Sequence, residues 1–233
     1  MPPLAKGPLI ALRADGIEIP GGIQGLSDFR AWARSEEFPE RGRIDWIEGR
    51  LEVDMSPEDL NTHGSPKSAI AIKIGSLLQE PGRAMVFIDR ARYSCPDADL
   101  SVEPDVLVLL VETLERGRAR LLPKVSGVEG RYVEIEGAVD LAVECLSDSS
   151  EEKDEGLREK YHRASVREYW LVDARKDEID FQLLLYRPSG YLEAPRDGEG
   201  FARSEVLGGR VRLVRAREVA GLVFFRLEVK LGE

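Results

Sequence analysis

The sequence predicts an α/β domain built on a mixed β-sheet that helices flank. Segments with helical and with strand periodicity follow one another along the chain and do not separate into two blocks, which is typical of this class. The 233 residues are 42% hydrophobic and 33% charged, the composition of a globular protein. A chain of this length can bury a sizeable core as one domain. We therefore expect a single domain over residues 26–233.

The first elements are expected from short local signals. Residues 1–25 are rich in glycine and proline without a sustained period, so we expect an irregular lead-in. Ser27 is a suitable N-cap for a short helix that ends before Pro39. Apolar residues then alternate from Ile44 to Val53 with Gly49 at the centre, which predicts a β-hairpin.

The clearest amphipathic helix begins near Ser56. Its apolar stripe is drawn by residues three and four positions apart, and Pro81-Gly82 ends it. The stripe consists of Ile70, Ile74, Leu77 and Leu78. Strands are expected to follow over residues 84–89, 92–95 and 106–111.

The middle of the chain is polar and rich in arginine from residue 112 to residue 138. A loop of this length inside a compact domain is either functional or mobile. Its arginines could form either a solvated surface or a clamp on DNA. A strand is expected over 139–146, a helix-start cluster at 147–150 and a helix over 152–164.

The last third of the chain predicts further strands. Residues 168–173 and 179–186 are expected to pair with each other. Residues 190–233 alternate weakly and are expected to complete an edge of the sheet. At least one of Tyr169 and Trp170 is expected to pack in the core rather than to stack on a base.

Composition and charge exclude several classes of protein. No apolar run is long enough to span a bilayer and the N-terminus does not resemble a signal peptide, so we expect a cytoplasmic protein with no membrane partner. The two cysteines, Cys95 and Cys145, belong to no zinc-binding motif. The net charge of −10 argues against delocalised nucleic-acid binding, although a local basic groove remains compatible with it.

Two carboxylates stand in or beside apolar runs that should become buried strands. Asp105 precedes the run 106–111, and Glu144 lies within the run 139–146. A buried carboxylate is costly unless a cation or hydrogen bonds hold it. If the two strands are neighbours, the pair is suited to a hard divalent metal such as Mg²⁺. The simpler interpretation of Asp105 is a residue that caps a loop after proline, whereas a glutamate between Val143 and Cys145 has little structural reason to be there.

At these two carboxylates the sequence resembles a known family. It resembles the Uma-two family of restriction endonucleases, which belongs to the PD-(D/E)XK nuclease-like superfamily. The resemblance is carried by the segments IDWIEGRLEVDMSP, VEPDVLVL, VDLAVECLSDSS and VREYWLVDA, by His63 and by the stretch from Asp154 to Tyr161. The resemblance covers roughly residues 27–190. It implies a restriction-endonuclease-like core, in which helices flank a mixed central sheet, with an N-terminal helix and a β-hairpin.

The resemblance also implies a metal site at one end of the central strands. Glu48, Asp105, Glu144 and the backbone carbonyl of Cys145 would bind Mg²⁺ or Mn²⁺, and His63 would lie close behind them. A water on the metal would be the nucleophile. From the residues alone, Glu48 could equally be an ordinary exposed turn residue and His63 a structural or solvent-facing one.

The sequence departs from the superfamily pattern at its lysine. Leu146 stands where that lysine is expected, two residues after Glu144. The family resemblance implies that the following helix supplies the cation, and Lys160 matches that position; Lys153 competes but lies near the helix start. A lysine on such a helix could also belong to a solvated face. A second departure is Asp148, where the family usually has proline.

These observations predict a metal-dependent deoxyribonuclease, with Asp105, Glu144 and Lys160 as catalytic residues. DNA is the expected substrate, and a homodimer is expected because two-fold symmetry suits enzymes that cut both strands. One alternative is a catalytically inactive relative that binds nucleic acid or protein. Another is an enzyme that uses the same carboxylates on a different phosphate ester.

Overall fold

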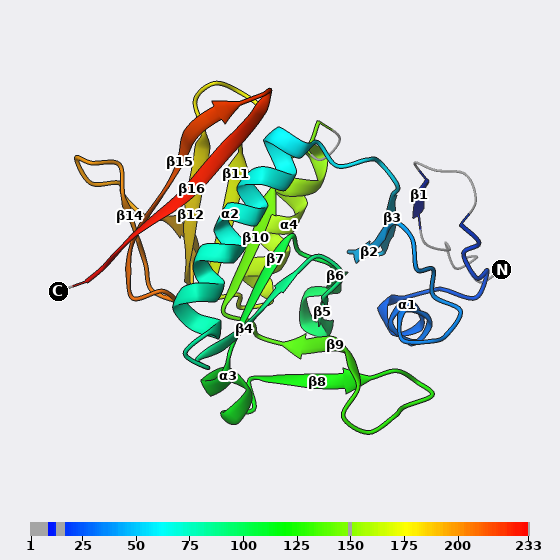
Figure 1. The fold of residues 1–233 in the computed structure, drawn as a ribbon. Coiled ribbons are helices and arrows are strands. Elements are labelled where there is room, and N and C mark those ends of the chain that lie inside the picture. The colour runs from blue at the N-terminus through cyan, green and yellow to red at the C-terminus, as the bar shows by residue number, and fades with distance from the viewer. Residues whose placement is uncertain (1–8, 13–16, 149–150, 233) are drawn as a thin grey trace.

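The computed structural model describes residues 9–12, 17–148 and 151–232, and it has the predicted mixed α/β architecture (Figure 1). Its described part contains α1 (Leu26–Ala33), α2 (Ser65–Ile74), α3 (Val111–Glu115) and α4 (Glu151–Arg163). Shorter helical turns are Leu60–Gly64, Gly75–Gln79 and Pro96–Ala98. None of the described helices is both long enough and apolar enough to cross a membrane.

The central sheet has six described strands in the order β13-β12-β11-β10-β7-β4. The strands are β4 (Ala84–Ile88), β7 (Val106–Leu110), β10 (Leu141–Cys145), β11 (Glu168–Asp173), β12 (Asp180–Arg187) and β13 (Gly190–Glu193). Strands β10 and β11 are parallel, and the other pairs of this sheet are antiparallel. The sheet is therefore mixed, and the predicted pairing of β11 with β12 is confirmed.

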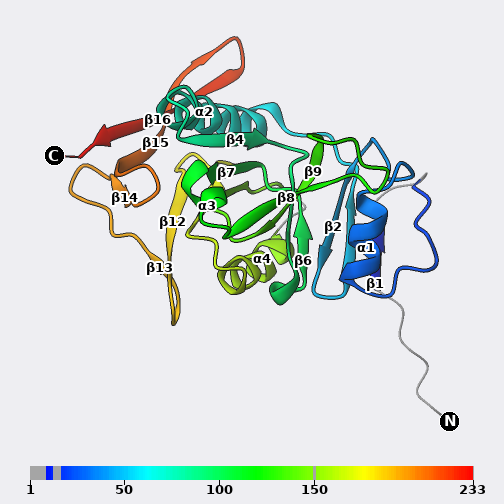
Figure 2. The same ribbon diagram turned by 90° about the horizontal axis from the view of Figure 1, so that it is seen from below.

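The two faces of this sheet are covered by different helices. Helix α2 lies over one face and α4 over the other (Figures 1 and 2). Successive strand residues point to opposite faces, so Val106 and Val108 pack in the core with α2, whereas Leu107 and Leu109 pack in the core with α4. Both faces are buried, which explains why the two apolar runs are nearly continuous.

The hairpin belongs to a second sheet, and the N-terminal helix α1 packs against this sheet. Its seven described strands follow the order β1-β3-β2-β6-β5-β9-β8. The strands are β1 (Leu9–Leu12), β2 (Arg43–Ile47), β3 (Arg50–Asp54), β5 (Arg92–Cys95), β6 (Leu100–Val102), β8 (Ala119–Pro123) and β9 (Tyr132–Gly137). Glu48 and Gly49 form the two-residue turn with φ values of 49° and 75°, as a type I′ turn requires.

Helix α2 is the predicted amphipathic helix. Ile70, Ile74 and Leu78 are buried, and the helical turns before and after α2 extend it to residues 60–79. Asp59 caps the start, because its side chain accepts hydrogen bonds from the backbone N–H groups of Asn61 and Thr62.

Three expectations about elements differ from the structure. Residues 112–138 are not one long loop, since they include most of α3 and the hairpin β8–β9. The lead-in contains β1, which pairs with β3. Residues 190–232 extend the edge of the central sheet only through β13; β14 (Ala202–Ser204), β15 (Gly209–Val219) and β16 (Leu222–Leu231) form a separate sheet. Of the predicted helix-start cluster, Ser149 and Ser150 lie outside the described residues.

Candidate functional site

A cleft of about 830 Å³ lies between the hairpin β2–β3 and the ends of β7 and β10. Its described lining contains more carboxylates than arginines. The carboxylates are Glu52, Asp54, Glu58, Asp59, Asp89, Glu103, Asp105, Glu144 and Asp148, and the arginines are Arg43, Arg50, Arg90 and Arg175. Such a lining attracts cations more strongly than anions.

Asp105 and Glu144 lie side by side in this cleft. Strands β7 and β10 are antiparallel with Val106 opposite Val143, so continuing that register by one residue sets Asp105 opposite Glu144. The two residues are only 3% and 4% exposed. The two strands are therefore neighbours, which is the condition that the sequence left open.

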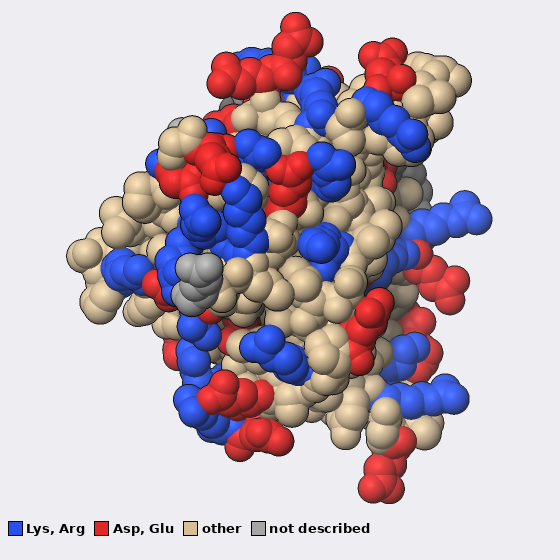
Figure 3. Space-filling view, turned by 60° about the vertical axis from the view of Figure 1, so that its left-hand side comes forward, with Lys and Arg blue, Asp and Glu red and all other residues tan. Residues whose placement is uncertain are grey.

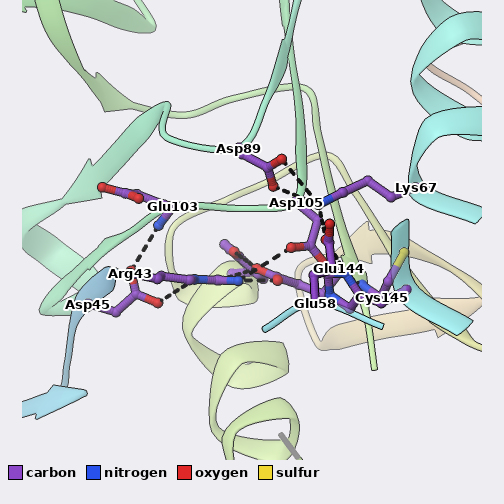
Figure 4. A network of polar contacts seen from close by, with 11 residues as sticks. Arg43, Asp45, Glu58, Lys67, Asp89, Glu103, Asp105, Glu144 and Cys145 are labelled. Carbon is purple, nitrogen blue, oxygen red and sulfur yellow. Dashed lines mark hydrogen bonds and ion pairs between the residues drawn. The ribbon is translucent and has the colours of Figure 1, made fainter. Parts of the chain in front are cut away.

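The Arg43 guanidinium lies between these carboxylates (Figure 4). One terminal nitrogen is 3.4 Å from Asp105 Oδ1, and the other is 3.2 Å from Glu144 Oε2. Its Nε atom donates to Asp45 Oδ2 at 2.8 Å. Burial opposes the charged form of Arg43, but the carboxylates of Asp45, Glu144 and Asp105 outweigh burial and hold the pKa of Arg43 well above its ordinary value.

Asp105 is also held from its other side. The backbone N–H of Cys145 donates to Asp105 Oδ2 at 2.7 Å, and His63 Nε2 lies 3.2 Å from the same oxygen. Burial favours the neutral acid, but the hydrogen bond from His63, the charge of Arg43 and the Cys145 N–H outweigh burial and lower the pKa of Asp105. Asp105 is therefore an ionised carboxylate with a fixed orientation.

His63 connects Asp105 to a second group of charges. Its Nδ1 atom lies 2.5 Å from Glu58 Oε1, and the Lys67 ammonium forms ion pairs with Glu58 and with Asp89. Burial opposes protonation of His63, but Asp105 and Glu58 outweigh burial and raise the pKa of His63. His63 thus lies directly against Asp105, as predicted.

Glu144 has a partner on α4. The Tyr161 hydroxyl donates to Glu144 Oε1 at 2.6 Å. Tyr161 is fully buried, and burial together with the charge of Glu144 raises its pKa well above the ordinary value, so the hydroxyl keeps its proton. Helix α4 therefore contributes to the site through a tyrosine hydrogen bond.

Of the remaining predicted residues, Cys145 lines the cleft, whereas Glu48 and Lys160 do not belong to its described lining. Lys160 forms an ion pair with Glu48 at 2.6 Å, and neither residue belongs to the described lining of the cleft. The hydrogen bond from Lys160 lowers the pKa of Glu48. The structure thus pairs Lys160 with Glu48 outside the described lining of the cleft. The side chain of Lys153 lies outside the described residues.

Sequence reasoning missed Arg43, Asp45, Tyr161 and Lys67. A signal existed for the first two, because alternation along β2 sets Arg43 and Asp45 on the same face of the strand. Tyr161 and Lys67 gave no such signal, since an aromatic or basic residue on a helix is usually part of a core or a surface.

The carboxylate pair fits a hard divalent cation. Mg²⁺ is commonly bound through one or two carboxylates and several waters, and Asp105 and Glu144 supply such oxygens. Their arrangement already holds one cation, the Arg43 guanidinium. Within residues 9–12, 17–148 and 151–232, no set of three or more histidine, cysteine, aspartate or glutamate side chains is arranged around a common metal position. The fit is therefore to a metal that keeps most of its water.

Comparisons with known proteins agree with this architecture. The model of a family named Uma2, described as "Putative restriction endonuclease", matches residues 26–213. Among solved structures, the chain is similar to a "putative nuclease belonging to DUF820" from Anabaena variabilis ATCC 29413. The TM-score is 0.54 at 19% sequence identity, over 78% of this chain and 90% of the other, a likeness that concerns the fold alone. No curated protein matches the sequence.

Proposed function

The chain belongs to the Uma2 family, and from this membership and the cleft we propose that it is a metal-dependent deoxyribonuclease. Asp105 and Glu144 would hold Mg²⁺ or Mn²⁺, and DNA would be the substrate. A divalent cation at this position would supply an activated water and polarise the phosphate. The observation that carries the proposal is the pair of adjacent, buried carboxylates, one directly before β7 and one on β10, that already share a cation.

The groups behind this pair support the proposal. The Cys145 N–H and His63 orient Asp105, and the Tyr161 hydroxyl orients Glu144. A site that must hold reacting groups in one geometry needs side chains that other residues fix in place. With these donors in place, Asp105 Oδ1 and both oxygens of Glu144 face the Arg43 guanidinium.

The charge of the cleft explains why DNA would need the metal. Nine carboxylates and four arginines line the described part of the cleft, so the lining repels a phosphate backbone. On the face shown in Figure 3, basic and acidic side chains are interspersed and do not form one broad basic surface. A bound divalent cation would lower the repulsion at the point where the phosphate approaches.

Several finer assignments stay predictions. The Cys145 backbone carbonyl is a predicted further ligand. Glu48 and Lys160 are predicted at the site from the sequence, but they pair with each other outside the described lining of the cleft, so the proposed metal site does not include them. A one-metal or a two-metal mechanism would use the same two carboxylates. A homodimer is predicted for cleavage of both strands.

Cleavage of supercoiled plasmid in Mg²⁺ or Mn²⁺ tests the proposed activity. Glu144→Gln should lower the rate at least about a hundredfold, because groups that merely support metal ligands are already worth roughly 10–100-fold. Glu52→Gln, which removes another carboxylate from the cleft lining, is the matched control and should cut at the wild-type rate. Equal cutting by Glu144→Gln and wild type would contradict the assignment.

A non-catalytic binding module is the second candidate function. The observation that favours it is Arg43, because a guanidinium between the two carboxylates neutralises them without any metal. Such a module should show no rise in melting temperature with Mg²⁺ or Mn²⁺. The proposed nuclease should gain about 2.7 kcal/mol when the metal is at a hundred times its Kd.

A further inference from the structure

Arg43 is attached to the site at two different points. Its Nε atom is paired with Asp45, which is fully buried and also accepts a hydrogen bond from the backbone N–H of Glu103 at 3.0 Å. Its two terminal nitrogens face Asp105 and Glu144 at the longer distances of 3.4 and 3.2 Å. The Nε atom of the guanidinium is therefore held by a shorter contact than its two terminal nitrogens.

The two terminal nitrogens of Arg43 and a metal ion would contact the same carboxylate oxygens of Asp105 and Glu144. A cation shared by Asp105 and Glu144 must lie between them, where the terminal nitrogens of Arg43 lie (Figure 4). Two cations at one position repel each other strongly in a buried site. Binding of the metal and the observed position of Arg43 are therefore mutually exclusive.

The Arg43 side chain can also adopt a position that faces the open cleft. It is 24% exposed and lines the cleft, whereas Asp105 and Glu144 are almost fully buried. Rotation about the bonds before the guanidinium can move the terminal nitrogens toward the cleft while Asp45 still attracts the group. A guanidinium facing the cleft presents the planar fork that binds phosphate oxygens bidentately.

Resting on the proposed function, we propose that Arg43 alternates between two anionic partners. Without metal it pairs with Asp105 and Glu144. When Mg²⁺ or Mn²⁺ takes that position, the side chain turns to a phosphate of the DNA in the cleft. Arg43 thereby supplies the positive charge that is missing at Leu146.

Two opposite effects of one substitution test this proposal. Arg43→Gln removes the competitor, so the Mn²⁺ affinity measured by calorimetry should tighten by roughly tenfold, within the usual range for two coupled binding events. The same variant, saturated with Mn²⁺, should bind a short phosphorothioate duplex, which hydrolyses slowly, at least about tenfold more weakly in fluorescence anisotropy. Loss of folding cannot tighten one affinity and weaken the other.

Two further variants complete the design. Arg50→Gln removes an exposed arginine from the same cleft lining and controls for the loss of one positive charge, so it should change both affinities much less. Arg43→Lys keeps the charge but lacks the planar fork that holds Asp45, Asp105 and Glu144 at once, so it should bind Mn²⁺ more tightly than wild type and the duplex more tightly than Arg43→Gln. Arg43→Lys also tests the proposal on its own if Arg43→Gln does not fold.

The outcomes separate this inference from the proposed function. An Mn²⁺ affinity in the Arg43 variants equal to that of wild type, or an unchanged duplex affinity, would overturn the alternation and leave the metal site standing. Absence of Mn²⁺ binding in every protein, wild type included, would overturn the proposed function together with it. Tighter metal binding with weaker duplex binding supports the alternation.

Discussion

At the scale of single residues, the site depends on how a few carboxylates share a few cations. Asp105 and Glu144 face one guanidinium, and His63 is shared by Asp105 and Glu58. Each buried carboxylate thus has a cationic or hydrogen-bonding neighbour, as the cost of burial requires. The position at which a metal would bind is defined by the placement of Arg43.

The Glu48–Lys160 ion pair leads to a prediction about stability. Lys160 is 2% exposed and Glu48 is 62% exposed, so the pair joins α4 to the hairpin turn at the surface. In a double-mutant cycle of Glu48→Gln and Lys160→Met, we expect a coupling of about 1 kcal/mol in the free energy of unfolding, as for partly exposed pairs. The Mn²⁺ affinity of all three variants, measured by calorimetry, should equal that of wild type. A loss of Mn²⁺ binding in Glu48→Gln would instead establish Glu48 as a ligand.

At the scale of elements, the segment after β7 shows how one buried side chain organises a region that is polar in sequence. Asp140 is 2% exposed and accepts hydrogen bonds from the Leu110 backbone N–H and the Thr113 hydroxyl, both at 2.9 Å. These bonds satisfy groups at the start of α3, where helix donors lack partners within the helix. Helix α3 therefore depends on a residue that lies far along the chain.

Asp140→Ala should lower the free energy of unfolding by about 2–3 kcal/mol, because it leaves two buried donors without their acceptor. Urea denaturation followed by circular dichroism measures this change. Glu112→Ala, which removes an exposed carboxylate from the same helix, is the control and should change stability by at most about 0.5 kcal/mol. An equal, small effect of both substitutions would show that Asp140 does not hold α3.

The same segment shows where sequence reasoning reaches its limit. Strands β7, β10 and β11 and helix α2 could be predicted, because local periodicity and burial agree there. The hairpin β8–β9 could not, since its polar, arginine-rich strands carry weak periodicity and its pairing partner β5 is distant in sequence. Likewise, Asp105 and Glu144 were predictable as unusual charges in apolar runs. For Arg43, alternation along β2 indicates only that it lies beside Asp45, because the tertiary fold alone brings the first residue of β2 to Asp105 and Glu144.

At the scale of the whole molecule, a buried carboxylate joins the central sheet to the C-terminal part of the chain. Glu168 on β11 is fully buried and accepts hydrogen bonds from the Ser204 hydroxyl at 2.9 Å and from the Val206 backbone N–H at 2.7 Å. Burial raises the pKa of Glu168 above its ordinary value of 4.5, although these hydrogen bonds act in the opposite direction. Ionised Glu168 is therefore less favourable in the folded protein than in the unfolded chain.

This shift predicts how stability depends on pH. A raised folded pKa means that the contribution of Glu168 is complete below about pH 4.5 and is lost as the pH rises through the folded pKa. The free energy of unfolding of Glu168→Gln, relative to wild type, should therefore increase from pH 4.5 toward neutrality. Urea denaturation at a series of pH values measures the difference, with exposed Glu193→Gln as the control. A difference that does not vary with pH would contradict the prediction.

The arrangement of the whole molecule also decides from which side a ligand can reach the carboxylates. The cleft is formed where the hairpin β2–β3 of one sheet meets the strand ends of the central sheet. The two sheets together enclose Asp105 and Glu144, and the cleft leaves one side of this carboxylate pair open to solvent. Under the proposed function, DNA would approach an acidic cleft, and a bound metal would determine whether a phosphate can enter.

The most direct test of the central claim is diffraction, at the manganese absorption edge, from crystals soaked in Mn²⁺. We predict an anomalous peak between the carboxylates of Asp105 and Glu144, with the terminal nitrogens of Arg43 turned away from both. A structure without such a peak, in which Arg43 still bridges the two carboxylates at saturating Mn²⁺, would contradict the account.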